Sequence, residues 1–123
     1  MNKAAAERVA LARSPDRPRI YDYISALFTN FFETHGDRLS GDDSAMLCGI
    51  ALFEGAPVTV AGTVKGTDVN KNIAANFGMA SPGGYRKFQR AIAKAEKFGR
   101  PVITFVDTPG ASPRAEDEER GQG

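Results

Sequence analysis

A short run of apolar and β-branched residues, 102–106, lies near the C-terminal end of the chain and stops abruptly at Asp107-Thr108-Pro109-Gly110. Consecutive apolar residues are typical of a strand covered on both faces, as parallel strands in α/β proteins are. Pro109 lacks an N–H and Gly110 allows a positive φ, so the chain leaves the sheet at once. The pattern predicts a buried parallel strand and a rigid turn, at the sheet edge where α/β folds bind ligands.

Two strands joined by a tight turn are predicted in the middle of the chain. Residues 45–53 are largely apolar, and residues 58–65 place valine or glycine at every second position. Glu54-Gly55, which precedes Ala56-Pro57, suits a hairpin turn. Residues 66–79 are polar and are expected to be irregular.

A helix is predicted between this hairpin and the last strand. Ser81 and Pro82 suit the N-cap and the first helical position, and Gly99 suits the position after the helix end. One face carries an apolar stripe: Tyr85, Phe88, Ala91, Ile92, Ala95 and Phe98. Most basic residues lie off this stripe and are expected to form a solvated face: Arg86, Lys87, Arg90, Lys94 and Lys97.

Two helices are predicted before the sheet. The alanine-rich residues 4–13 indicate a short helix, and residues 20–35, with apolar residues three and four apart, indicate a strongly amphipathic one ending before Gly36. Its phenylalanines are interpreted as core residues, with a partner interface as the alternative. We predict an N-terminal helical segment over residues 1–38 and the first part of a larger domain over residues 39–123.

Composition is that of a soluble globular protein. The 123 residues include 41% hydrophobic and 25% charged residues, enough for one domain with a core. A net charge of +1 gives no global field that would attract nucleic acid or anionic lipid. No stretch reaches the ~20 apolar residues of a membrane span, and Glu7 and Arg8 interrupt any secretory signal. A cytoplasmic protein that binds neither membrane nor nucleic acid is expected.

Side-chain nucleophiles and metal ligands are scarce. Cys48 lies in an apolar run and is interpreted as a small buried hydrophobe, and His35 is predicted at a helix end, on the surface. One His and one Cys are too few for a metal site of that type. The turn at 107–110 matches the Mg²⁺-side turn of P-loop GTPases, but the phosphate loop of those proteins is absent. The remaining interpretations are a structural turn, or backbone N–H groups presented to an oxyanion.

Five blocks of sequence resemble the α subunit of bacterial acetyl-CoA carboxylase carboxyltransferase. The resemblance runs in register over roughly residues 8–122 and is carried by residues 13–24, 34–38, 76–87, 95–111 and 118–122. It implies an α/β, crotonase-like fold (ClpP/crotonase superfamily) built of strand-strand-helix units, here with an incomplete core preceded by N-terminal helices. This agrees with the element order predicted from the hydrophobic pattern.

The resemblance also implies a function. Members of this family transfer CO₂ from carboxybiotin, held by the biotin carboxyl carrier protein, to acetyl-CoA, which gives malonyl-CoA for fatty acid biosynthesis. The β subunit binds acetyl-CoA, α subunits associate with one another in a heterotetramer, and biotin belongs to the carrier. By resemblance, Gly110 and Ala111 supply backbone amides to the biotin oxyanion, and Lys65 and Gly66 lie on the cofactor-binding side. No metal is implied.

The chain departs from the family at the turn. The family continues Ala-Tyr-Pro-Gly-Ile-Gly-Ala before Glu-Glu-Arg-Gly-Gln, whereas Ser112, Arg114 and Glu116 replace the Tyr and the two following Gly residues. Because glycine lets the backbone approach a ligand closely, Arg114 is expected to disturb the amide cradle. A glycine-rich loop that forms the other part of the family's oxyanion site would lie beyond residue 123. The alternative function is a truncated, non-catalytic paralogue or remnant that retains only an assembly surface.

Overall fold

The computed structural model describes residues 3–122, which form an α/β arrangement around one four-stranded mixed sheet. β1 and β2 are antiparallel, β2 and β3 are antiparallel, and β3 and β4 are parallel. The strands follow the order β1 (Thr29–Thr34), β2 (Met46–Phe53), β3 (Ala56–Thr63) and β4 (Val102–Phe105) across the sheet. The predicted hairpin is confirmed, and Glu54 and Gly55 at its turn both adopt positive φ, 50° and 83°. The predicted parallel pairing of the last strand is confirmed too.

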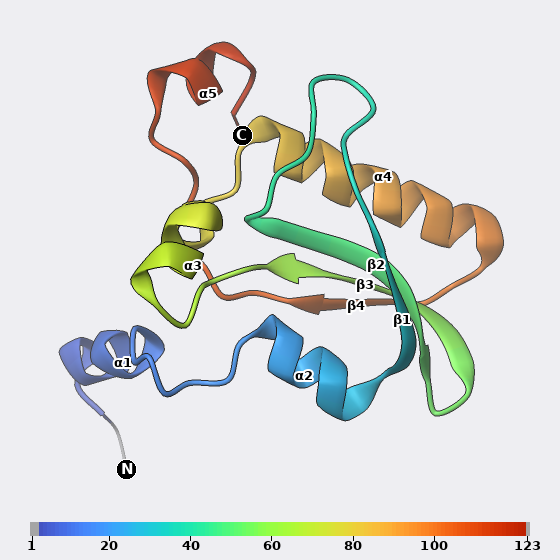
Figure 1. Cartoon of the computed structure of the whole chain (residues 1–123), viewed down its shortest axis with the longest axis horizontal. Coiled ribbons are helices and arrows are strands. Elements are labelled where there is room, and N and C mark those ends of the chain that lie inside the picture. Colours follow the sequence, from blue (N-terminus) through green and yellow to red (C-terminus); the bar gives the residue numbers. More distant parts are fainter. Residues whose placement is uncertain (1–2, 123) are drawn as a thin grey trace.

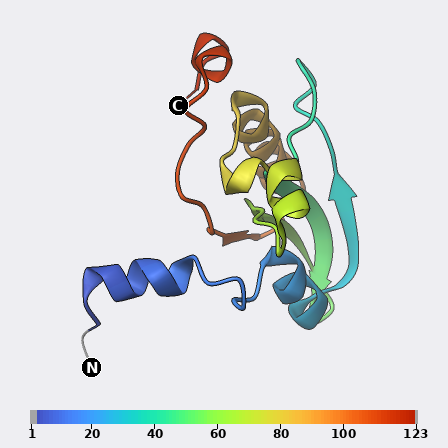
Figure 2. The ribbon, with the colours of Figure 1, turned by 60° about the vertical axis from the view of Figure 1, so that its left-hand side comes forward.

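Helices lie on both faces of the sheet (Figure 1). α4 (Pro82–Phe98) connects β3 to β4 and packs on β2 and β3, while α2 (Ile20–Leu27) lies on the opposite face. The remaining helical elements are α1 (Ala5–Ala12), α3 (Val69–Ala74), the 3₁₀ turn η1 (Asn76–Gly78) and α5 (Ala115–Glu119). Both α1 and α4 confirm predicted helices, and Gly99 ends α4 in the left-handed conformation, as its position predicts. α1 extends away from the body and buries no residue (Figure 2).

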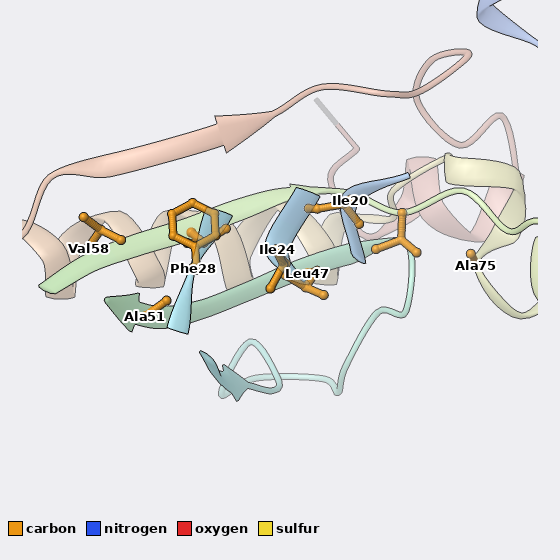
Figure 3. Packing of buried hydrophobic residues seen from close by; sticks show 9 residues of the cluster. Ile20, Ile24, Phe28, Leu47, Ala51, Val58 and Ala75 are labelled. Atoms are coloured by element: carbon orange, nitrogen blue, oxygen red, sulfur yellow. The ribbon is translucent and has the colours of Figure 1, made fainter. Parts of the chain in front are cut away.

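Two apolar clusters fill the space between the sheet and its helices. The first lies under α2 (Figure 3) and contains Ile20, Ile24, Phe28, Leu47, Ala51, Val58, Val60, Val64 and Ala75. The second lies under α4 and contains Ala45, Met46, Cys48, Ala61, Ala80 and Ala91. Alternate residues of β2 and β3 point to the two clusters, so both faces of these central strands are buried. Burial of this apolar surface holds α2, the sheet and α4 together.

The helix predicted over residues 20–35 is wrong beyond Leu27. Phe28 is extended, Asn30 has a φ of 53° at an irregularity in the pairing, and residues 29–34 form β1 along the edge of β2. Thr, Asn and Phe are weak helix formers, and pairing with β2 gives their backbone groups partners. His35 therefore follows a strand rather than ending a helix. The division at residue 38 stays a prediction, although α2 and β1, which precede it, share the sheet's core.

Two further expectations need correction. β4 is not buried on both faces: Ile103 and Phe105 pack against the α2 cluster, but Val102 and Val106 on the other side are exposed. α4 packs on β2 and β3 and leaves this face of β4 exposed, and in the described sheet β4 also has a neighbouring strand on one side only. Residues 66–79, expected to be irregular, contain α3 and η1. The Asp68 side chain accepts a hydrogen bond from the Lys71 N–H and caps α3, a short local signal within a polar stretch.

The basic residues of α4 do not form one solvated face. Lys87 is only 2% exposed, and its ammonium donates to the carboxylate of Asp42, while Arg86 donates to Asp37. Both carboxylates belong to the loop between β1 and β2. This loop therefore lies on α4 because ion pairs hold it there, a relationship that helical periodicity does not reveal.

Candidate functional site at the ends of β3 and β4

The parallel pairing of β3 and β4 brings their C-terminal ends to the same edge of the sheet. Lys65, just after β3, places its Nζ 3.1 Å from Oδ1 of Asp107, just after β4. The Asp107 N–H also donates to Oγ1 of Thr63, at 2.7 Å. These contacts join the two strand ends that the sequence singled out separately. The position corresponds to the edge where α/β sheets bind ligands.

A second cation reaches the same carboxylate. Arg19, just before α2, places Nη1 3.2 Å from Oδ2 of Asp107, and its Nη2 donates to the Ser14 carbonyl at 3.0 Å. The Arg19 side chain is only 6% exposed. Asp107 is thus held between two cations, and the local charge of the three side chains is positive. Such a site favours an anionic ligand over a cationic one.

The turn after β4 is partly engaged in its own hydrogen bonds. Thr108 Oγ1 lies within hydrogen-bond distance of the Gly78 and Gly110 carbonyls, and it accepts from the Gly110 N–H at 3.1 Å. Gly110 has a φ of 148°, which favours glycine. Within residues 3–122 no hydrogen bond engages the N–H of Ala111, which is exposed. Of the two amides predicted for an oxyanion, the one at Ala111 is available in this arrangement.

Gly66 has a structural reason to be glycine. Its N–H donates to Oδ1 of Asn72 at 3.0 Å, and a Cβ at this position would lie 2.3 Å from the Asn72 backbone nitrogen. The middle of α3, at Lys71 and Asn72, therefore packs directly on Gly66. Lys65, in contrast, points its ammonium to the strand-end site, so the two residues predicted together for cofactor binding have different surroundings.

Arg114 lies on the surface beyond the turn. Its φ of −74° and ψ of 141° are ordinary for any L residue, so position 114 needs no glycine conformation here. Its guanidinium pairs with Glu116 at 3.4 Å. Ser112, in contrast, is buried, and its hydroxyl donates to the buried carboxylate of Asp117. Of the three departures from the family, Ser112 and Arg114 thus lie on the turn before α5, and Glu116 lies in the first turn of α5.

Among the cavities beside the strand ends, two share Arg19 and Lys65. The larger, of about 450 Å³, lies among α2, the end of β3 and α3 and is lined by residues that include Arg19, Tyr21, Val64, Lys65 and Lys71. The smaller, of about 270 Å³, is lined by Arg13, Arg19, Lys65, Asn72, Phe77 and Pro109. Arg19 and Lys65 line both cavities. The two cations that pair with Asp107 are therefore accessible from two spaces, one beside α2 and α3 and one beside the turn.

Other chemistry has little support among the described residues. In residues 3–122 no group of three His, Cys, Asp or Glu side chains is arranged to hold a metal ion. Burial raises the pKa of the Cys48 thiol to about 11, so it stays protonated near neutral pH, as expected of a small buried hydrophobe. None of the helices in the described part of the chain has the length and apolarity needed to cross a membrane.

Sequence reasoning identified one half of this site and missed the other. It predicted the turn with Gly110 and Ala111, and Lys65 at the end of the second strand. It missed Arg19, because no local pattern signals an ion pair between residues 88 positions apart. It also assigned no role to Phe77, because what distinguishes this residue is its positive φ, which the amino-acid sequence does not reveal.

Comparisons with known proteins agree on one family. The family described as acetyl co-enzyme A carboxylase carboxyltransferase-like matches residues 2–123. The acetyl-coenzyme A carboxylase carboxyl transferase subunit alpha of Anoxybacillus flavithermus is 58% identical over 116 residues, which are 94% of this chain and 36% of that protein. The same subunit of Geobacillus thermodenitrificans is 56% identical over the same shares. The chain thus spans about a third of the length of these relatives.

A solved structure has a similar fold. The β subunit of Pseudomonas aeruginosa geranyl-CoA carboxylase superimposes with a TM-score of 0.61 at 20% identity, over 95% of this chain and 23% of that one. At this identity the similarity concerns the arrangement of strands and helices alone. The sequence match, which extends over almost the whole chain, decides the family: the chain belongs to the acetyl-coenzyme A carboxylase carboxyltransferase-like family.

Proposed function

We propose that this chain forms the first part of a carboxyltransferase α subunit with a crotonase-like fold, and that the ends of β3 and β4 receive carboxybiotin from a carrier protein. The observation that carries the proposal is the Lys65–Asp107 ion pair, which joins the end of β3 to the turn after β4. The free N–H of Ala111 follows in that turn. Family membership over residues 2–123 supports the same assignment.

The residues present fit a planar, anionic urea. Bound here, carboxybiotin would supply CO₂, and the urea left behind would take the proton that the methyl group of acetyl-CoA loses, so that the resulting carbanion captures the CO₂ to give malonyl-CoA. The Ala111 N–H donates to the urea oxygen, where negative charge develops as CO₂ leaves. Lys65 and Arg19 keep the local potential positive, and Asp107 holds both cations in place. The chain's contribution is positioning and electrostatic stabilisation, with no titrating side chain at the reacting atoms.

The proposed partners follow from the same assignment. A β subunit supplies the acetyl-CoA side, a biotin carboxyl carrier protein brings the biotin, and a second α subunit completes a cytoplasmic heterotetramer. Because the acetyl-CoA side belongs to another subunit, the isolated chain is expected to give no turnover.

A chimera tests the proposal. The 116 matched residues of the Anoxybacillus flavithermus α subunit are replaced by those of this chain, and the product is purified with that organism's β subunit. Malonyl-CoA decarboxylation with free biotin as acceptor is then measured, with the natural pair as the positive control and the isolated chain as the negative one. Turnover by the chimera supports the proposal. An assembled but inactive chimera overturns it.

The second candidate is a non-catalytic remnant that keeps an assembly surface. The exposed side of β4, with Val102 and Val106, favours it because an apolar edge strand invites pairing with another chain. The chimera discriminates between the two, since the remnant predicts assembly with the β subunit and no turnover.

A further inference from the structure

Three consecutive residues at the site have left-handed backbone conformations. Asn76, Phe77 and Gly78 have φ values of 46°, 56° and 77°. Asn and Gly tolerate this region, but a bulky aromatic residue there is an outlier. Such conformations persist where the surrounding structure enforces them, and they concentrate at functional sites. The strain at Phe77 therefore requires an explanation from its surroundings.

The ends of β3 and β4 hold this segment in place. Thr108 donates from Oγ1 to the Gly78 carbonyl, and Asn76 donates from its side-chain amide to the Met79 carbonyl at 2.9 Å. A Cβ on Gly78 would lie 2.9 Å from Cγ of Lys65 and 3.3 Å from the Asp107 carbonyl oxygen. The segment is thus packed against both residues of the strand-end ion pair. Its conformation and the site are parts of one arrangement.

In this arrangement the Phe77 side chain is half-exposed to solvent rather than buried. Phe77 is 49% exposed and belongs to neither apolar cluster. It lines the cavity of about 270 Å³ beside Pro109, together with Arg13, Arg19 and Lys65. Small-molecule pockets are typically ~300–1,000 Å³, so this cavity suits one ring of a ligand rather than a whole one. Because one open cavity is lined by an aromatic ring and by cationic side chains, it favours binding of a flat ligand group that carries a negative charge.

We propose that Phe77 is an aromatic platform for the ligand, on which the flat urea ring packs while Arg13 and Lys65 attract its carboxylate. The identity of the ring rests on the proposed function above. The platform itself rests on the strained, half-exposed Phe77 and the cations of its cavity. Phe77 positions the ring against the turn of β4 and takes no part in bond making.

Direct binding is measured by fluorescence, because the chain contains no tryptophan. Phe77→Trp is introduced into the chimera assembled with its β subunit, and free biotin is titrated. The matched control is Phe98→Trp, at the exposed C-terminal end of α4. With β-subunit emission subtracted by using the unsubstituted complex, a saturable change for Phe77→Trp alone is expected. No change at position 77, or equal changes at both positions, overturns the proposal.

Steady-state kinetics distinguish the proposed binding role of Phe77 from the proposed carboxyltransferase function on which it rests. Phe77→Leu is expected to raise the KM for biotin about 2- to 10-fold, as loss of an aromatic contact does, with kcat little changed, and Phe77→Tyr to restore it. An unchanged KM in an active complex overturns the platform alone. An inactive unsubstituted complex whose Phe77→Trp emission still responds to biotin contradicts the proposed reaction and leaves the binding site standing.

Discussion

Lys87 and Asp42 form an ion pair of 2.7 Å between the middle of α4 and the loop that follows β1. The Lys87 ammonium also donates to the Asp43 carbonyl at 2.9 Å, and its side chain has almost no contact with solvent. Asp43 in turn accepts from the backbone N–H and the hydroxyl of Ser81, just before α4. The loop is therefore tied to α4 at two places, and this fixes where β2 begins.

Replacing Lys87 with methionine is expected to destabilise the chain by about 1–3 kcal/mol. The Asp43 carbonyl loses its donor and Asp42 loses its partner. The loss is below the ~3–5 kcal/mol of a fully buried pair, because Asp42 stays partly exposed. Lys94→Met, on the exposed side of the same helix, is the matched control and should change stability by no more than ~0.5 kcal/mol. Urea unfolding midpoints measure both, and equal effects would contradict a role for the ion pair.

Acid should destabilise the fold through Asp37. The N–H groups of Gly41 and Leu39 hold the pKa of this buried carboxyl far below its usual range, and Ser40 and Arg86 add to the effect. A lowered folded-state pKa gives stability that is present above the unfolded pKa of ~3.9 and is lost as pH falls below it.

Thermal unfolding at several pH values tests this. The Tm of the unsubstituted chain should exceed that of Asp37→Asn near pH 7, and the difference should narrow as pH falls from about 5 to 3. Asp16→Asn is the control, since Asp16 is exposed in the segment before α2. A difference between the unsubstituted chain and Asp37→Asn that stays constant over this range would show that the shifted carboxyl does not set the acid response.

Self-association is expected at β4. Val106 is 84% exposed, and β4 has only β3 as a neighbour in the described sheet. Apolar edge strands pair with other chains, and a lysine on such an edge opposes this. Val106→Lys should therefore reduce the mass measured by size-exclusion chromatography with light scattering. Val69→Lys adds the same charge on α3 and should not. A monomeric unsubstituted chain would contradict this expectation.

The predictability of each element depended on how local its signals were. The hairpin and α4 were predicted because Glu54-Gly55, Pro82 and Gly99 act within a few residues of where they stand. β1 was not predicted, because its strand conformation depends on pairing with β2, where Phe32 faces Ile50. Apolar spacing alone does not distinguish a helix from a strand edge that tertiary pairing stabilises.

The same distinction applies to the site. The turn after β4 was predicted because an apolar run ending in Pro-Gly is a local pattern. The cations around Asp107 come from segments before α2 and after β3, so only the folded chain brings Arg19 and Lys65 together. Arg114 was expected to disturb the amide cradle, because a glycine there would let the backbone approach a ligand more closely. Its backbone is extended, so position 114 needs no positive φ, and the effect of its side chain on the cradle stays a prediction.

The turn also contains a buried pair that bears on the departures from the family. The Ser112 hydroxyl donates to the carboxylate of Asp117, and both residues are only 4% exposed. Ser112 stands where the family run has Tyr, and Asp117 stands where that run ends in Ala. A smaller residue at 112 leaves room for a carboxylate at 117, and the carboxylate gives the hydroxyl an acceptor. We therefore expect the two changes to compensate each other structurally.

A double-mutant cycle tests this compensation. Ser112→Ala should cost about 1.5–3 kcal/mol, because a hydrogen bond to a buried charged group is lost and Arg114 Nε, 4.0 Å away, is the remaining ionic contact of Asp117. Asp117→Ala should cost less, since a hydroxyl left without an acceptor is easier to accommodate than a carboxylate. If Ser112 and Asp117 act as a pair, the double variant should lose much less free energy of unfolding than the two single variants lose together. The effects of independent sites would add within ~0.3–0.5 kcal/mol. Arg114→Ala with Glu116→Ala, an exposed pair, is the control and should be nearly additive.

A tyrosine at position 112 gives a second test. Ser112→Tyr alone should destabilise the chain more than Ser112→Tyr combined with Asp117→Ala, because removal of the Asp117 carboxylate makes room for the tyrosine ring. Additivity at 112 and 117 in urea unfolding would contradict the compensation and would leave Ser112 as an isolated departure.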